Sequence, residues 1–526
     1  MNKKTLHAAV LAGLAAMGAT SPANAVHINP DGLGQVLIFP YYTVRAGQFT
    51  AVLIANTQNN TKAVKVRFLE GKNGREVLDF NLFLSPNDIW TGAVVATADG
   101  ARIISNDNSC VTPSDLFAET RTDGLGLAMN AFKNYAYTGA AADNPALSSM
   151  DRTREGFFEV IEMGVIDDDL ITGNTMTAGN TAPIVTGYIK HDATGVPANC
   201  GALDSFDASS GRLSLQFPNT GATGPLMQPP RGGLAGRASI INSATGANYT
   251  FSPTALDAWS ATVKYSGVGS AAPLLTAVNP LVSTVLTSDG AVTATWATGR
   301  EAISAALMRD SVQNEFILDT GTQSQTDWIV TFPTKHYFVG AGPGIAPANA
   351  APFANNFHAT NDGSCDFYDT AVFNREEQIP GTNNPVDSGL PPVTTVLSQI
   401  CWQTNVIPFS PGSLLASINS QPLVASLAAF ASNARSTSVA PGTPSLRGLQ
   451  GPNGSFVMKF NAVWQHLTPL SATKLAMGSL APVAYNFGTH NGMPVIGAMV
   501  HNYLNTGVAS RYGGVIDHKF TRSVNP

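Results

Sequence analysis

The strongest constraint on the fold is an alternation of apolar and polar side chains with a period of two residues. Apolar side chains alternate with Lys65 and Arg67 in residues 63–70, and with Asp79 in residues 77–84. Successive side chains of a β-strand point to opposite faces, so this spacing can bury one face and leave the other wet. The pattern predicts two strands whose charged side chains lie in solvent.

Turn-forming residues separate these runs from further strand candidates. Asn, Gly and Pro supply the positive or fixed φ angles of tight turns, and they gather at 58–60, 71–74 and 85–88. Further strands are predicted at 34–40, 49–56, 89–97 and 101–105. Six or seven strands in about 85 residues are typical of an immunoglobulin-like sandwich, which we predict for residues 26–112.

The rest of the chain predicts a second, larger domain. The alternation fades in residues 113–154, which we interpret as a connector or excursion. Strand character returns at 156–163, so a larger β-sandwich domain with long loops is predicted for residues 155–526. About 500 residues exceed what one hydrophobic core usually serves, which also favours two or more domains. The predicted fold class is mainly β.

Three shorter patterns predict further elements of the second domain. Ala302 and Ala305 follow helical spacing, so a helix is predicted at 300–314. Apolar and β-branched residues predict strands at 182–189 and 336–339.

The N-terminus has the features of a secretory signal in residues 1–25. Lys3 and Lys4 precede a short apolar run, and small residues at Ala23 and Ala25 offer a cleavage site. An apolar run of about 12 residues is shorter than the roughly 20 that cross a bilayer as a helix. We therefore predict an exported chain, in the periplasm, at the cell surface or outside the cell, without a transmembrane segment.

Four cysteines form an even set, which in an exported chain favours disulfides over metal thiolates. Three pairings of Cys110, Cys200, Cys365 and Cys401 exist. Proximity in sequence favours Cys110 with Cys200 and Cys365 with Cys401.

The charge pattern argues against a nucleic-acid partner. The net charge is −6, and Lys and Arg are scattered without a basic stripe. Charged residues make up 12% of the chain, about half the usual share, so neutral hydrogen-bonding groups fill much of the surface. Such a surface suits self-association or contact with components of the cell envelope.

Three familiar catalytic motifs are missing from the sequence. They are the nucleophile elbow, the zinc-protease helix motif and the phosphate-binding loop. Glu155 and Glu159 fall on one face of a predicted strand and form the best candidate acid/base pair of a glycosidase, whereas Glu162 falls on the other face. Structural surface carboxylates are the simpler interpretation of all three.

Metal chemistry has one weak candidate. Asp167, Asp168 and Asp169 form the densest acidic cluster and suggest calcium, but they lack the alternating order that wraps one cation. A solvated turn is the simpler interpretation, and no cofactor is predicted. His490 and His501 are the nearest histidine pair beyond the signal, and locally satisfied histidines are the default there.

Aromatic side chains offer candidate platforms for sugar rings. These are Tyr41 and Tyr42 together with the six tryptophans, at positions 90, 259, 296, 328, 402 and 464. Core packing is the default for each of them, and we predict it for Trp90.

Four segments resemble those of an uncharacterised family of secreted proteobacterial β-rich proteins. They are LIFPYYTV (37–44), LDFNLFLSP (78–86), EVIEMG (159–164) and VTFPTK (330–335). The resemblance implies export and a β fold, and it carries no activity, ligand or catalytic residue.

Two functions fit these observations. The first is a noncatalytic exported protein of the cell surface or extracellular space, structural or adhesive, acting through protein or glycan contacts. The alternative is a secreted hydrolase of polysaccharides that uses Glu155 and Glu159. Low charge and the absence of familiar catalytic motifs favour the first.

Overall fold

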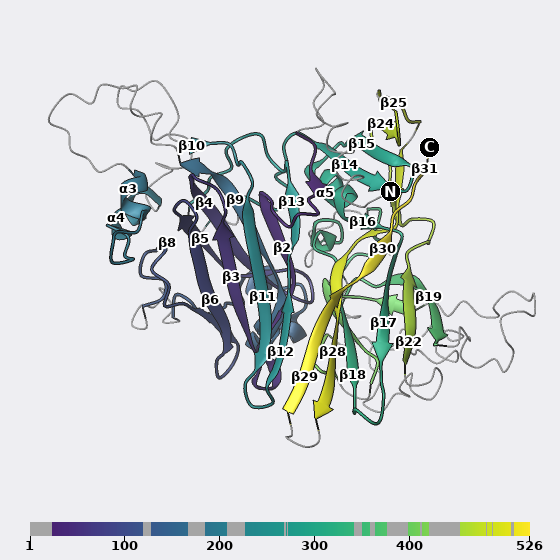
Figure 1. The fold of residues 1–526 in the computed structure, drawn as a ribbon, viewed down its shortest axis with the longest axis horizontal. Helices are drawn as coiled ribbons and strands as arrows, with labels where there is room; N and C mark the ends of the chain where they lie inside the picture. The colour runs from purple at the N-terminus through teal and green to yellow at the C-terminus, as the bar shows by residue number, and fades with distance from the viewer. Residues whose placement is uncertain are drawn as a thin grey trace, which may run out of the picture.

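The fold is mainly β, with several antiparallel sheets arranged in two neighbouring halves (Figure 1). It was obtained as a computed structural model. The structure describes residues 24–118, 128–166, 185–207, 227–267, 270, 272–340, 350–357, 363–375, 398–410, 413–419, 453–479, 481–486, 488–505 and 510–525.

Two sheets face each other in the N-terminal half. The larger, here named the covered sheet, has the order β1-β13-β2-β9-β4-β5-β8, and β10 pairs with β9. Its strands are β1 (His27–Ile28), β13 (Thr254–Asp257), β2 (Val36–Thr43), β9 (Glu155–Ile166), β4 (Thr61–Glu70), β5 (Glu76–Leu84), β8 (Cys110–Thr112) and β10 (Met227–Gln228).

The second sheet, here named the open sheet, has the order β12-β11-β3-β6-β7. Its strands are β12 (Ala247–Phe251), β11 (Leu234–Asn242), β3 (Phe49–Asn56), β6 (Ile89–Ala96) and β7 (Ala101–Ile104). Alternate residues of both sheets meet in a shared core, in which Phe39 stacks on Phe158 and Trp90 is fully buried as predicted. Period-two burial therefore builds a sandwich here.

Strand pairing does not change at residue 155, where the sequence suggested that a second domain starts. β9 lies between β2 and β4, and β11 pairs with β3. β11, β12 and β13 thus complete the two sheets to which β2 and β3 belong. The immunoglobulin-like topology of residues 26–112 stays a prediction, because both sheets take strands from outside that range.

Three larger sheets form the C-terminal half. The middle sheet comprises β21 (Thr404–Pro408), β18 (Gln325–Thr331), β28 (Ile496–Asn505) and β29 (Ser510–Asp517). The distal sheet comprises β20 (Ser398–Ile400), β19 (Asp366–Asn374), β22 (Asn453–Lys459), β17 (Ser311–Ile317) and β30 (Lys519–Thr521). The upper sheet comprises β14 (Val282–Thr287), β15 (Gly290–Thr295), β24 (Ser471–Ala476) and β25 (Val483–Ala484).

Short strands and helices complete the described elements. The short strands are β16 (Met308–Arg309), β27 (Met493–Pro494), β23 (His466–Leu467), β26 (Thr489–Asn491) and β31 (Val524–Asn525). The α-helices are α3 (Val185–Ile189), α4 (Gly201–Asp207) and α5 (Gly299–Leu307). The 3-10 turns are Arg45–Gly47, Tyr135–Tyr137, Gly139–Ala141, Pro145–Leu147, Met150–Arg154 and Lys335–Tyr337.

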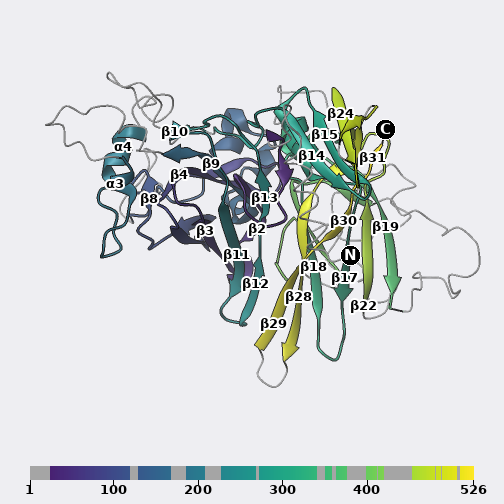
Figure 2. The ribbon, with the colours of Figure 1, turned by 45° about the horizontal axis from the view of Figure 1, so that its top comes forward.

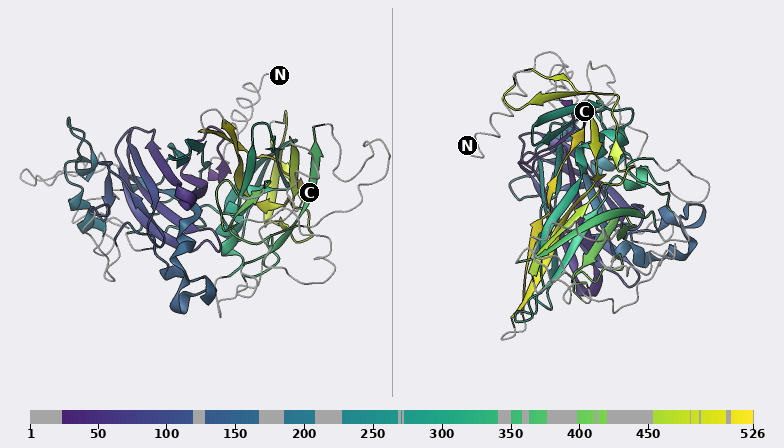
Figure 3. Two further views of the ribbon diagram at one scale, coloured as in Figure 1. Left: turned by 90° about the horizontal axis from the view of Figure 1, so that it is seen from below. Right: turned by 90° about the vertical axis from the view of Figure 1, so that its right-hand side faces the viewer.

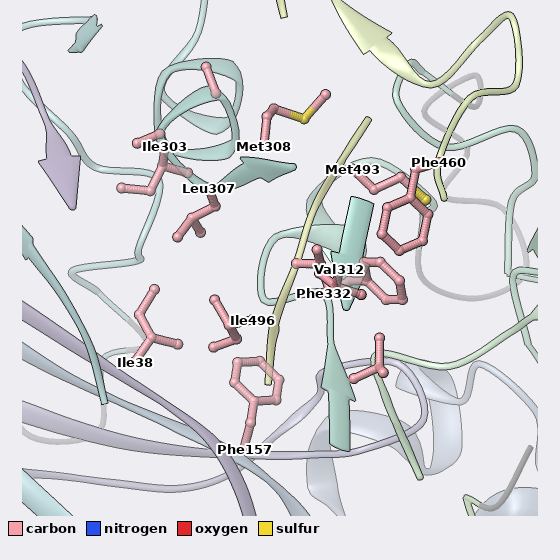
Figure 4. Packing of buried hydrophobic residues seen from close by; sticks show 14 of the residues in the cluster. Ile38, Phe157, Ile303, Leu307, Met308, Val312, Phe332, Phe460, Met493 and Ile496 are labelled. Atoms are coloured by element: carbon pink, nitrogen blue, oxygen red, sulfur yellow. The ribbon is translucent and has the colours of Figure 1, made fainter. Parts of the chain in front are cut away.

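The two halves lie next to each other (Figures 2 and 3), and one cluster of buried apolar side chains takes members from both. Ile38 and Phe157 of the covered sheet lie in one cluster with Ile303, Leu307 and Ile496 of the C-terminal half (Figure 4). The halves are therefore joined by a continuous apolar core.

β12 and β29 lie side by side at the front of the molecule (Figure 1). Gly513 of β29 makes this approach possible, because a Cβ there would come within 2.2 Å of the Tyr249 ring of β12. The backbone nitrogen of Arg511 also donates to the carbonyl of Thr245 at 3.1 Å. The open sheet and the middle sheet thus meet edge to edge.

Three elements predicted for the second domain, residues 155–526, differ in the structure. The helix predicted at 300–314 ends at Leu307, and from Ser311 the burial alternates with a period of two in β17. Residues 185–189 form helix α3 where a strand was predicted, and 335–337 form a 3-10 turn within the other predicted strand. Strand-forming composition in short runs did not decide the backbone at these places.

Both disulfides favoured by sequence proximity are present. Cys110 is bonded to Cys200, and Cys365 is bonded to Cys401. The first links β8 to the start of α4, and the second links the start of β19 to the end of β20.

Candidate functional site

The charged face of β4 is buried, and the prediction that it lies in solvent is wrong. Lys65 is 0% exposed and Arg67 3% exposed. Lys65 Nζ lies 2.8 Å from Asp79 Oδ2 and also donates to the carbonyls of Gly267 and Ser270. Segments outside the sheet therefore cover this face, and each buried charge has a partner.

Glu159, one of the two candidate catalytic carboxylates, belongs to this buried charged face. Arg67 Nη1 lies 2.9 Å from Glu159 Oε2, and Arg67 Nε lies 2.8 Å from Glu76 Oε2. Burial raises the pKa of Glu159 to about 7, and the Arg67 guanidinium opposes that rise. The carboxylate is fully buried, so its role here is to pair with Arg67.

Glu155, the other candidate, joins the two halves of the molecule. It accepts hydrogen bonds from Arg45 Nε at 2.8 Å and Tyr41 Oη at 2.7 Å. Ser417 Oγ and the backbone nitrogen of Ile418, from the C-terminal half, donate to it at 2.5 and 2.9 Å. These four donors from both halves thus hold this carboxylate in place, and Glu155 itself is 1% exposed.

The spacing along β9 also separates the two carboxylates. Four residues of strand span roughly 13 Å between Glu155 and Glu159, whereas glycosidase pairs lie at most about 9.5 Å apart. Glu162 pairs with Lys62 at 2.7 Å, and the backbone nitrogens of Arg231 and Gly232 donate to it. The three glutamates of β9 therefore hold the sheet together at three places.

The acidic cluster suggested for calcium, Asp167, Asp168 and Asp169, lies outside the described residues. Within the described part of the chain, no group of three or more His, Cys, Asp or Glu is arranged to hold a metal ion. His490 is buried against Trp296, and burial lowers its pKa to about 4, so its ring serves packing.

The aromatic candidates separate into buried and exposed groups. Tyr41 and Tyr42 are fully buried. The tryptophans at 90, 259, 296 and 328 are at most 1% exposed. Trp402 is half-buried, with Lys72 Nζ 4.3 Å from its ring centre. Trp464 is the most exposed tryptophan, at 36%. It is the one aromatic platform among the sequence candidates that reaches well into solvent.

The loop that bears Trp464 also lines an open groove of about 490 Å³, here named the 459–466 groove, although the Trp464 side chain is not part of that lining. It forms where the end of β22, the start of β17, β23, β26 and β30 converge. Its lining is Asp310, Ser311, Lys459, Phe460, Asn461, Ala462, Val463, Gln465, His466, Asn491, Thr521 and Ser523. Hydroxyl, amide, imidazole and single charged groups thus line one depression.

Gln465 fixes the loop that bears the groove. Its Oε1 accepts from the backbone nitrogen of Ala462 at 3.0 Å, and its Nε2 donates to the carbonyl of Phe367 at 2.7 Å. The backbone nitrogen of Gly492 donates to the Gln465 carbonyl at 2.7 Å. The loop is therefore tied to both β19 and β27, although it lies at the surface.

The Trp464 ring packs against β19 and is partly exposed. It lies edge-on to Phe367, with centroids 6.4 Å apart, and the residue is 36% exposed. A partly exposed aromatic ring is suited to stacking against a ligand.

The polar lining is prearranged by hydrogen bonds among groove residues. Ser311 and Thr521 are joined through their hydroxyls at 2.5 Å, and Thr521 also donates to Asp310. Asn491 Nδ2 donates to the Ser523 hydroxyl at 3.2 Å. Asp310 is the one carboxylate in the lining, so a two-carboxylate glycosidase mechanism has no second member among these residues.

A second depression lies on the distal sheet. It has a similar volume of about 490 Å³ and is lined by Glu315, Phe316, Ile317, Arg375, Asn453, Gly454, Ser455 and Tyr503. It also holds a single carboxylate, and it lacks an exposed tryptophan.

Sequence reasoning singled out Trp464 but missed the groove that its loop helps to line. Asp310, Lys459, Asn491 and Thr521 come from four separate stretches of chain, and none carries a motif. Their convergence depends on strand order, which a single sequence does not reveal.

Comparison of the chain with protein-family models, with curated protein sequences and with solved structures found no match. Among the described residues, no helix has the length and apolar content required to cross a bilayer.

Proposed function

We propose that the chain is a noncatalytic exported protein that acts at the cell surface or outside the cell by binding glycan through the 459–466 groove. The observation that carries this proposal is the groove's lining of hydroxyl and amide groups, on a loop that also bears the exposed Trp464 ring. Sugar rings combine apolar faces with many hydroxyls, so an aromatic platform next to neutral hydrogen-bonding groups suits them.

Export and a structural or adhesive role belong to the same proposal. The secretory signal expected in residues 1–25 and the two disulfides support an oxidising compartment. Membership of a secreted proteobacterial family rests on the four segments that resemble it.

The hydrolase alternative is the less favoured of the two. Its candidate pair, Glu155 and Glu159, is buried in ion pairs, and neither residue lines the groove. We therefore place the sugar contacts, and not a cleavage reaction, in the groove.

A binding assay tests the proposal. The disulfide-bonded chain without residues 1–25 is applied to a panel of immobilised polysaccharides that includes lipopolysaccharide, peptidoglycan fragments, cellulose and xylan. We expect saturable binding to at least one of them. Trp464→Ala should weaken that binding about tenfold or more, which corresponds to roughly 1.4 kcal/mol.

The matched control is Tyr512→Ala, since Tyr512 is an aromatic residue 58% exposed on β29, outside the groove. It should bind like the unmodified chain. Equal losses in both variants, or no binding by the unmodified chain, would contradict the groove assignment. Release of reducing ends from a bound polysaccharide would favour the hydrolase instead.

A further inference from the structure

The outer face of the open sheet is exposed and largely apolar. Its registered rows are Ile89–Ala55–Ala235, Thr91–Leu53–Arg237, Ile104–Ala93–Ala51–Ser239–Thr250, Arg102–Val95 and Phe49–Ile241–Asn248. Ile89 is 50% exposed and Ile104 is 38% exposed. The other apolar residues of these rows are half-buried. These rows are here named the open face, and Figure 1 shows the strands β6, β3, β11 and β12 that carry most of it.

An apolar surface of this extent is unusual on a chain that works alone. Contiguous apolar patches of several hundred Å² on soluble proteins commonly mark interaction sites. Five strands of four to nine residues, about 4.8 Å apart, give a flat area of roughly 500 Å². A stable interface buries about 800 Å² of accessible surface per partner, and the open face approaches that size because side-chain relief adds to the flat area.

One pair of opposite charges on this face, Arg237 and Asp107, can be matched between two copies. Arg237 is exposed at one end of the central row, and no ion pair joins it to a carboxylate in the described part of the chain. At the other end, Asp107 accepts from Thr91 through both its backbone nitrogen and its hydroxyl, at 3.0 and 3.2 Å. Its second oxygen accepts from Ser109, so the described bonds of this carboxylate come from neutral donors.

We propose that two copies of the chain pack through their open faces, about a two-fold axis that runs parallel to the strands between β3 and β6. Such an axis exchanges β3 with β6 and β11 with β7. Arg237 of each copy then lies opposite Asp107 of the other.

The same axis matches large side chains with small ones. Ile89 lies opposite Ala55 of the second copy, and Ile104 lies opposite Ser239. Alternation of large and small residues across two facing sheets is what lets their side chains interdigitate. The register of the open sheet therefore supplies both charge and shape complementarity to a second copy.

Mass measurement in solution tests this interface. The disulfide-bonded chain without residues 1–25 should sediment as a dimer with a dissociation constant in the micromolar range or below. Leu53→Asp, which places a carboxylate beside the axis, should raise the dissociation constant at least about 100-fold. Thr473→Asp on the exposed face of β24 is the matched control and should leave the dimer unchanged.

Charge and distance readouts locate the axis. Arg237→Glu should weaken the dimer about tenfold, because it sets two carboxylates opposite each other, whereas Lys519→Glu on exposed β30 should not. A chain with Ala51→Cys should crosslink with a chain carrying Ala93→Cys, and a Thr250→Cys chain should not crosslink with itself.

A monomer at about 100 µM, well above the expected dissociation constant, would overturn the proposal, as would a dimer that survives Leu53→Asp. A dimer that lacks the mixed crosslink would also overturn it. Circular dichroism of each variant separates loss of the dimer from loss of the fold. Glycan binding by the groove is independent of these results, so either proposal can fail alone.

Discussion

The two sheets of the N-terminal half reverse the usual relation between residue type and burial on their outer faces. The covered sheet presents Lys65, Arg67 and Glu159, and all three are buried. The open sheet presents Ile89 and Ile104, which are well exposed. Hydropathy alone would assign these faces the other way round, so the available partners decide which face is covered.

The covered face shows what burial of charge requires. Each charged group there has an opposite charge within hydrogen-bonding distance, as in the pairs Arg67 with Glu159 and Lys65 with Asp79. Removal of ions from water costs several kcal/mol each, and close pairs offset that cost only while both partners remain. The open face carries few such groups, and covering it would cost little desolvation.

The largest effect is expected from breaking a pair on the covered face. Arg67→Met leaves Glu159 and Glu76 without their cation, so we expect a loss of about 3–5 kcal/mol of unfolding free energy at pH 8. Arg67 lowers the pKa of Glu159, so its removal lets that carboxyl hold its proton more readily. The loss should therefore be smaller at pH 5.

Arg237→Met is the matched control on the open face, since Arg237 is exposed. Urea unfolding at dilute protein concentration measures both variants. Equal losses would mean that ion pairing does not distinguish the two faces.

A smaller effect is expected from a buried carboxyl that has only neutral partners. Asp327 is fully buried, and it accepts from Ser413 Oγ at 2.5 Å and from the backbone nitrogen of Leu415 at 3.1 Å. Burial raises its pKa to about 7, and these hydrogen bonds oppose that rise. The folded chain then binds this proton more tightly than the unfolded chain, so stability falls as pH rises from about 4 to 7.

Asp327→Asn removes this proton and should flatten the pH dependence. Between pH 5 and pH 8 the unmodified chain should lose roughly 2–3 kcal/mol more than the variant. Burial lowers the pKa values of His336 and His518 to about 3, so these two residues make stability rise with pH. Both are present in both chains and therefore do not affect the comparison. Identical pH slopes in the two chains would show that Asp327 is ionised throughout.

Local patterns predicted the strands and cores of this fold better than their assembly. The strand predicted at 49–56 is β3, and Trp90 lies in the core as expected. The boundary suggested at 155 depends on which strands pair, and β9 pairs with β2 and β4 across more than 85 residues of sequence. Non-local pairing leaves no signature in the period of one strand.

The candidate site was predictable only in part for the same reason. Trp464 attracted attention as an aromatic residue, but its exposure follows from the position of the loop that Gln465 fixes. Glu155 and Glu159 matched the residue types of a catalytic pair. Their cations, Arg45 and Arg67, lie 92 or more residues away, so the buried pairing was invisible in the sequence.

The smallest effect compares two neighbouring residues of β7 that face opposite sides. Ile103 is fully buried between the sheets, whereas Ile104 is 38% exposed on the open face. Ile103→Val deletes a methylene from a packed core and should cost about 0.5–1.5 kcal/mol, whereas Ile104→Val should be close to neutral in the monomer. Because backbone, strand and substitution are the same, thermal unfolding at dilute concentration isolates the two environments. If Ile104→Val cost as much as Ile103→Val under these conditions, the open face would already be packed within one chain, and no second copy would be needed to cover it.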